Sequence, residues 1–156
     1  MGLTQDILRE PVASVPISPG VMLDGSVRVR DAIAAMRNHQ QGCVVVVDSH
    51  GRPEGKFTEH QIARLMTQRP GFLNEPVRSF IREAWSQMRQ SESIANLIHK
   101  LQTYRQRHVI VVDDDGRAIG VVGQKGLMEY LTEQFPRLVK VQQMETKVAM
   151  EAREGA

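Results

Sequence analysis

The sequence is poor in the residues that most often carry redox, nucleic-acid or membrane functions. Cys43 is the one cysteine, so no intramolecular disulfide can form, and its apolar neighbours indicate a buried thiol. Four Phe, two Tyr, one Trp and a net charge of +2 without a basic run make a weak case for nucleic acid. No apolar run reaches the roughly 18 residues of a membrane span, and Met1–Glu10 lacks the apolar centre of a signal peptide. We therefore expect a cytoplasmic protein that does not bind membranes.

Signs of metal binding and catalysis are also missing. The histidines show no metal-ligand spacing with Cys43 or with each other. The run Asp113–Gly116 lacks the further acidic positions of a calcium loop, and a polar hairpin turn explains it better. No nucleophile stands beside a base. We expect a non-enzymatic protein with no catalytic residues, no metal site and no required cofactor.

The sequence does contain a long internal repeat. Residues 44–62 align without a gap with residues 109–127, at a constant shift of 65 positions. Self-similarity of this kind indicates two copies of one structural unit. Each copy is too small to bury a sufficient core alone, so we expect the copies to pack against each other.

The repeat predicts an α+β fold in which each unit runs strand, helix, strand, strand, helix. Cys43–Val47 is apolar and rich in β-branched residues, which is typical of a strand buried on both faces. Thr58 and Ser93 are suited to cap helices, and Thr4 is suited to cap a short helix before Pro11. The last helix of the second unit is expected to end before Pro136. Methionines at apolar positions, including Met66 and Met128, are expected to fill the core.

The composition suggests five segments. They are an N-terminal helix and linker (1–19), a first repeat (20–70), a linker (71–84), a second repeat (85–135) and a C-terminal arm (136–156). In the arm, apolar residues recur three or four positions apart within Arg137–Glu154, which predicts an extra helix with a thin apolar stripe. Such a stripe favours packing on a neighbouring surface, either of the same chain or of another subunit.

The residues around the repeat resemble a known family. Gly42–Asp48 with Gly55–Glu59, and Arg107–Asp113 with Gly120–Val122, are similar to the core strands of cystathionine β-synthase (CBS) domains. Two such units in tandem resemble a Bateman module, related by a pseudo-two-fold axis. The resemblance implies a regulatory module that binds an adenine nucleotide (AMP, ADP or ATP) between its repeats, transmits a conformational change and forms a homodimer.

The resemblance also implies a binding site. In such modules a Ser or Thr at a helix start contacts phosphate or ribose, and an Asp three positions later accepts two hydrogen bonds from the ribose. The first copy has Thr58 and Gln61 at these places, whereas the second has Gly123 and Gly126. Gln lacks the carboxylate charge, which weakens the contact by about 1–3 kcal/mol. We therefore expect one nucleotide per chain at most.

The phosphate groups of such a ligand would meet basic residues of the second copy. The resemblance assigns this role to Arg107, His108 and Lys125, with Thr58 and Gln61 turned toward the ribose. Each residue also has a simpler interpretation: a helix cap for Thr58, a solvated strand edge for Arg107 and a structural histidine for His108. The alternative function is a ligand-free dimerisation scaffold with vestigial sites, which binds a protein partner through its C-terminal arm. Nucleic-acid binding through surface Arg and Lys is a weaker third hypothesis.

Overall fold

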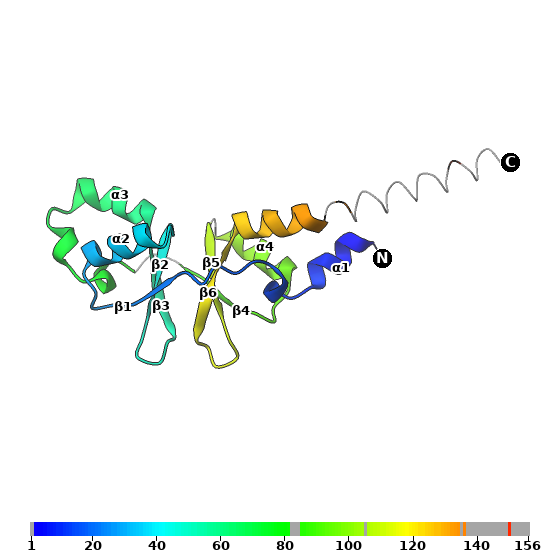
Figure 1. Ribbon diagram of the computed structural model, residues 1–156, viewed down its shortest axis with the longest axis horizontal. Helices are drawn as coiled ribbons and strands as arrows, with labels where there is room; N and C mark the ends of the chain where they lie inside the picture. The colour runs from blue at the N-terminus through cyan, green and yellow to red at the C-terminus, as the bar shows by residue number, and fades with distance from the viewer. Residues whose placement is uncertain (1, 82–84, 105, 135, 137–149, 151–156) are drawn as a thin grey trace.

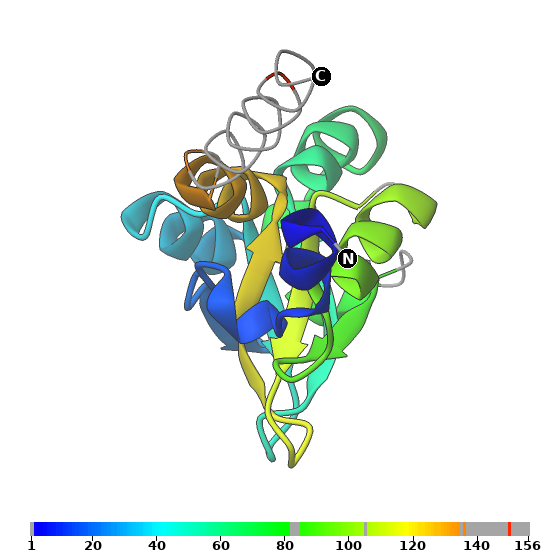
Figure 2. The same cartoon turned by 90° about the vertical axis from the view of Figure 1, so that its right-hand side faces the viewer.

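The computed structural model describes residues 2–81, 85–104, 106–134, 136 and 150, and it has the expected α+β architecture. Within these residues the strands form two three-stranded sheets, ordered β1-β2-β3 and β4-β5-β6. The sheets stand side by side, with the helices above them and the two hairpin tips at the opposite end (Figures 1 and 2). No described helix has both the length and the apolar character to cross a membrane.

The two repeats have the same topology. In the first, β1 is parallel to β2 and β2 is antiparallel to β3; in the second, β4, β5 and β6 pair in the same way. The first repeat consists of β1 (Val21–Asp24), α2 (Val29–Asn38), β2 (Cys43–Val47), β3 (Pro53–Thr58) and α3 (Glu59–Gln68). The second consists of β4 (Gln87–Arg89), α4 (Ile94–Thr103), β5 (His108–Val112), β6 (Ala118–Gly123) and a helix at 124–134.

Both hairpin turns are built by an aspartate and a glycine. The carboxylate of Asp48 accepts backbone N–H bonds from His50 and Arg52, and Asp113 does the same in the second turn. Gly51 and Gly116 have φ values of 78° and 80°, which L side chains rarely adopt. The two turns touch, because the N–H of Ala118 donates to the carbonyl of Gly51 at 2.9 Å. The polar-turn interpretation of residues 113–116 is therefore confirmed.

The core explains why β2 and β5 are apolar throughout. Val44 and Val46 pack with α2 inside the first repeat, whereas Cys43 and Val45 face the second sheet. There they join Ile110, Val112 and Val121 in one cluster. Both faces of each central strand are thus buried, and the expected packing of one copy on the other is confirmed.

The segment that precedes each repeat packs on the other repeat. α1 (Leu3–Arg9) is followed by a 3₁₀ turn (Val12–Ser14), and Ile7 and Val12 lie in the core of the second repeat. Two 3₁₀ turns (Phe72–Asn74 and Val77–Phe80) likewise belong to the core of the first repeat. Bridges between Pro11 and Ser93 and between Pro76 and Arg28 repeat this relationship at the 65-residue shift. The exchange ties the repeats into one body.

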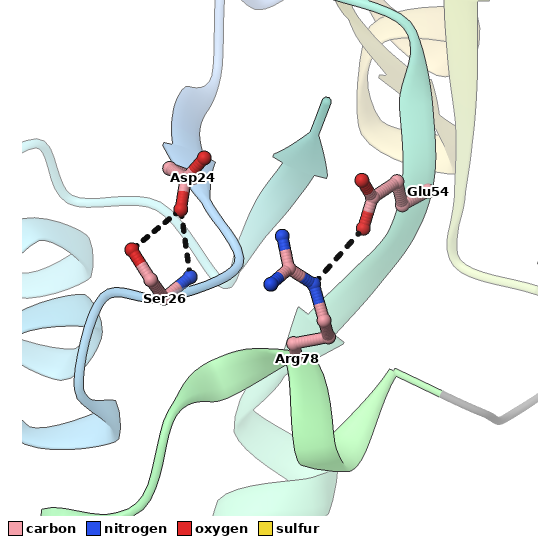
Figure 3. A network of polar contacts seen from close by, with 4 residues as sticks. All are labelled: Asp24, Ser26, Glu54 and Arg78. Atoms are coloured by element: carbon pink, nitrogen blue, oxygen red, sulfur yellow. Dashed lines mark hydrogen bonds and ion pairs between the residues drawn. The ribbon is translucent and has the colours of Figure 1, made fainter. Parts of the chain in front are cut away.

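A small polar network lies where residues 72–80, the segment before the second repeat, meet the first repeat (Figure 3). The Nε of Arg78 lies 3.4 Å from a carboxylate oxygen of Glu54 on β3. Asp24 accepts bonds from the N–H and hydroxyl of Ser26, and these bonds hold the pKa of Asp24 below its ordinary value. The guanidinium of Arg78 also covers Gly25, where a Cβ would lie 2.7 Å from Nε.

Several local predictions need correction. α1 begins at Leu3, not after Thr4; Gly2 is its N-cap and no side chain caps it. The end of the helix at 124–134 is described only as far as residue 134, so its expected end before Pro136 stays a prediction. Met66 and Met128 are 71% and 58% exposed, so they do not fill the core, although Met36 and Met88 do. The predicted arm helix at 137–154 falls outside the described residues, apart from Met150.

Candidate ligand-binding site

A pocket of about 850 Å³ opens between the two repeats. One wall is the end of β3 and the start of α3; the other is the end of α4 and the start of β5. The lining residues are mostly polar or charged: Gly42, Lys56, Thr58, Glu59, His60, Arg64, Tyr104, Gln106, Arg107 and His108. Three of the five residues expected at the site, Thr58, Arg107 and His108, are therefore brought together.

Thr58 and Gln61 form a capping box at the start of α3. The Thr58 side chain accepts the backbone N–H of Gln61, and the Gln61 side chain accepts the backbone N–H of Thr58 at 2.7 Å. The Nε2 of Gln61 donates to the carbonyl of Phe80 at 2.7 Å, and the residue is only 2% exposed. Gln61 is thus buried with its amide already bonded, and it is absent from the lining, where the ribose contact was expected.

Lys56 connects the walls of the pocket. Its Nζ donates to the backbone carbonyl of His108 at 2.6 Å. Burial lowers the pKa of Lys56. Burial also lowers the pKa of His108, and the charges of Lys56 and Arg107 lower it further. These positive charges favour a neutral imidazole. A bound anion would reduce their repulsion of the protonated ring.

The charge of the lining favours an anionic ligand. Lys56, Arg64 and Arg107 contribute three positive charges, and Glu59 contributes the one carboxylate of the lining set. The backbone N–H of Glu59 donates to the Gly42 carbonyl at 3.1 Å, which holds the start of α3 beside β2. Cations around a partly enclosed space raise the local concentration of anions. Among the described residues, no group of three metal-ligating side chains occurs.

The second copy of the motif is placed differently. Lys125 is exposed near the start of the helix at 124–134, at the position equivalent to His60, and does not line the pocket. A Cβ on Gly123 would collide with the carbonyl of Arg107, and a Cβ on Gly126 would lie 2.8 Å from the carbonyl of Pro16. Close backbone contacts explain the two glycines.

Most residues of the pocket lining were not among the predicted site residues. Lys56 could have been noticed, because it is a charged residue between Gly55 and Phe57 in the strand that pairs with the buried strand Cys43–Val47. Tyr104 and Arg64 carried none, since each lies on the polar face or at the end of an amphipathic helix. Only the packing of α3 beside the end of α4 brings them to the pocket.

Known proteins resemble this chain in sequence or in structure. An uncharacterized 17.7 kDa protein in the bps2 3′ region of Acidianus ambivalens is 20% identical over 122 residues, or 78% of this chain and 73% of that protein. The CBS domain pair of protein MJ0100, solved with 5′-methylthioadenosine and S-adenosyl-L-methionine, has a TM-score of 0.70 at 19% identity, covering 80% of this chain and 97% of that one. The CBS domain protein PAE2072 from Pyrobaculum aerophilum, complexed with AMP, has a TM-score of 0.66 at 21% identity, covering 78% and 98%.

The match to the family itself is extensive. The sequence model of the CBS domain matches residues 6–68 and 79–133, which together are more than half of the chain. These ranges contain both sheets and the residues of the pocket. The chain therefore belongs to the CBS domain family and consists of a tandem pair of these domains.

Proposed function

We propose that the chain is a non-enzymatic regulatory module that binds an adenine nucleotide in the pocket between its repeats. The observation that carries the proposal is the convergence of Thr58, Lys56, Arg107 and His108 on one 850 Å³ space. A capped helix start beside three positive charges suits a phosphate group. Two structurally similar CBS proteins were solved with adenosine compounds, which supports the same class of ligand here.

The module would signal by changing how the repeats sit against each other. The pocket has walls from both repeats, so a ligand that contacts both stabilises one relative arrangement. The ligand must bind one arrangement more tightly, because equal affinity for two states shifts nothing. We place this activity in the cytoplasm, and the free thiol of Cys43 fits a reducing compartment.

Thermal unfolding with AMP, ADP and ATP tests the proposal. A ligand at about 100 times its dissociation constant adds about 2.7 kcal/mol to the free energy of unfolding. Thr58→Ala combined with Arg107→Ala should abolish this stabilisation, whereas Lys125→Ala, outside the pocket, should preserve it. Absence of stabilisation at millimolar nucleotide would refute nucleotide binding.

A ligand-free scaffold is the second candidate, and the motif positions favour it. Gln61 is bonded to Phe80, and Gly123 and Gly126 are packed against the chain's own carbonyls. In that case no nucleotide would stabilise wild-type protein, and truncation after Pro136 would change the oligomer size or the binding of a protein partner.

A homodimer fits either candidate. Met66 on α3 and Met128 on the equivalent helix at 124–134 are both largely exposed, and we propose that they contribute to the contact between two copies of the chain. Both helices lie on the helical side of the molecule (Figure 1). Light scattering of wild type and of the Met66→Glu, Met128→Glu double variant tests this surface. If wild type is a dimer and the double variant has the same mass, the two methionines do not form the dimer contact.

A further inference from the structure

Glu59 is an unexpected residue in a pocket of this charge. A carboxylate in a site for a simple polyanion lowers affinity by repulsion. Glu59 is exposed at the start of α3 and makes no ion pair or side-chain hydrogen bond within the described part of the chain. Because a carboxylate only accepts hydrogen bonds, its presence in the lining suits a ligand that offers donors as well as phosphate oxygens.

Tyr104 is the second unusual feature of the lining. It ends α4 as its C-cap residue, is 56% exposed, and is the one Phe, Tyr or Trp among the lining residues. Its side chain makes no hydrogen bond or ring contact with the other described residues. A tyrosine that supports no core and borders a polar pocket offers a face on which a planar ring can stack.

The positions of these residues suit the parts of one ligand. Glu59 follows Thr58 on the wall of the first repeat, and Tyr104 belongs to the wall of the second. Lys56, Arg107 and His108 lie at the strand ends between them, where Lys56 already bonds to His108. The pocket thus combines a ring platform, an acceptor for hydroxyl or amino donors, and a cationic centre.

We propose that Glu59 and Tyr104 determine the specificity of the pocket: Tyr104 stacks on the base, and Glu59 accepts hydrogen bonds from the ribose hydroxyls. The proposal rests on the nucleotide-binding function proposed above. Glu59 then supplies the ribose acceptor that Gln61 does not offer, because Gln61 is buried and its amide is bonded to Phe80.

Isothermal titration with three probes tests the proposal: AMP, 2′,3′-dideoxy-AMP and inorganic pyrophosphate. Tyr104→Ala should weaken both nucleotides about tenfold and leave pyrophosphate unchanged, since stacking requires a base. Glu59→Gln should weaken AMP relative to dideoxy-AMP about tenfold and should strengthen pyrophosphate binding. Tyr104→Phe, which keeps the ring, should bind AMP as wild type does.

Two matched controls separate recognition from folding. Asp31→Asn removes an acidic residue from the first turn of α2, away from the pocket, and Leu73→Ala removes a partly exposed apolar side chain. Neither should change any affinity. AMP affinity that is unchanged in Tyr104→Ala or Glu59→Gln, or an equal loss for all three probes, would overturn the proposal while nucleotide binding stands. Failure of wild-type protein to bind AMP would instead refute the underlying function, and with it this proposal.

Discussion

The Nζ of Lys56 on β3 donates a 2.6 Å hydrogen bond to the backbone carbonyl of His108 on β5. The bond crosses from the first repeat to the second at the edge of the pocket. It therefore belongs both to the packing of the two repeats and to the charge of the candidate site. A ligand anion that attracts the ammonium group acts on a contact between the repeats.

Lys56→Met should lower stability and anion binding together. The substitution keeps most of the aliphatic side chain but leaves the His108 carbonyl without this donor, at a cost of about 1–2 kcal/mol for a half-buried charged hydrogen bond. Urea denaturation measures the loss, and Lys125→Met is the control because Lys125 is exposed and outside the pocket. Equal stability of the two variants would show that the bond contributes nothing.

Gln61→Glu should destabilise the protein at neutral pH. The variant has the same shape, but an ionised carboxylate cannot donate to Phe80, so two acceptors would face each other at the place of the 2.7 Å bond. We expect a loss of about 1–3 kcal/mol in the free energy of unfolding. Thermal unfolding at neutral and at acidic pH checks the reason: the loss should shrink where the new carboxyl is protonated, and a loss independent of pH would contradict it.

Gly123→Ala should be costly, although Gly123 is equivalent to Thr58. Any Cβ at this position meets the Arg107 carbonyl, which is backbone and cannot rotate away. Overpacking of this kind costs about 1–3 kcal/mol. Gly42→Ala is the control for stability, since its Cβ would meet Glu59 at an ordinary 3.6 Å. A Gly123→Ala protein as stable as Gly42→Ala would show that the strand end relaxes freely.

Protonation of His108 should link both stability and binding to pH. Burial, followed by the charges of Lys56 and Arg107, lowers the pKa of His108 below its ordinary 6.5, while Glu59 opposes them weakly. The unfolded chain therefore binds a proton first, so stability holds above about pH 6.5 and falls as the pH drops toward the lowered pKa. A bound anion favours the protonated ring, so affinity should rise over the same interval.

The comparison of wild type with His108→Gln isolates this effect, because the titration of the ligand phosphate is common to both. Affinities for AMP and unfolding midpoints measured between about pH 8 and about pH 5 provide the test. The other basic side chains of the pocket, including His60 and Arg64, are present in both proteins. Parallel pH profiles for the two proteins would rule out His108 as the linked group.

The architecture could be predicted well from the sequence, because the same pattern of strands, helix caps and turns occurs twice. The structure confirms several features that depend on only a few neighbouring residues. They are the β-branched strands at 43–47 and 108–112, the helix caps Thr58 and Ser93, and the hairpin turns that begin at Asp48 and Asp113. Thr4 shows where a local rule was insufficient. The first helix starts at Leu3 with Gly2 as its N-cap, although no side chain caps it.

The candidate site was only partly predictable, because its residues come from segments that the chain brings together by packing. The family resemblance predicted Thr58, Arg107 and His108 at the site, and these three residues do line the pocket. Gln61 was expected beside them, but its amide reaches Phe80 in a segment whose position depends on the exchange between repeats. Lys125 was expected there as well, yet it lies at the equivalent of His60 in the other copy.

Local features of the sequence are sufficient to predict a pair of like α+β units with two central strands buried on both faces, since periodicity, β-branching and turn chemistry are properties of neighbouring residues. The tertiary structure decided which side chains share a pocket. Lys56 and Glu59 belong to the first unit and Tyr104 to the second, and only the burial of one sheet against the other places a lysine, a carboxylate and an aromatic ring around a common space. That burial is long-range and non-directional, so no local pattern records it.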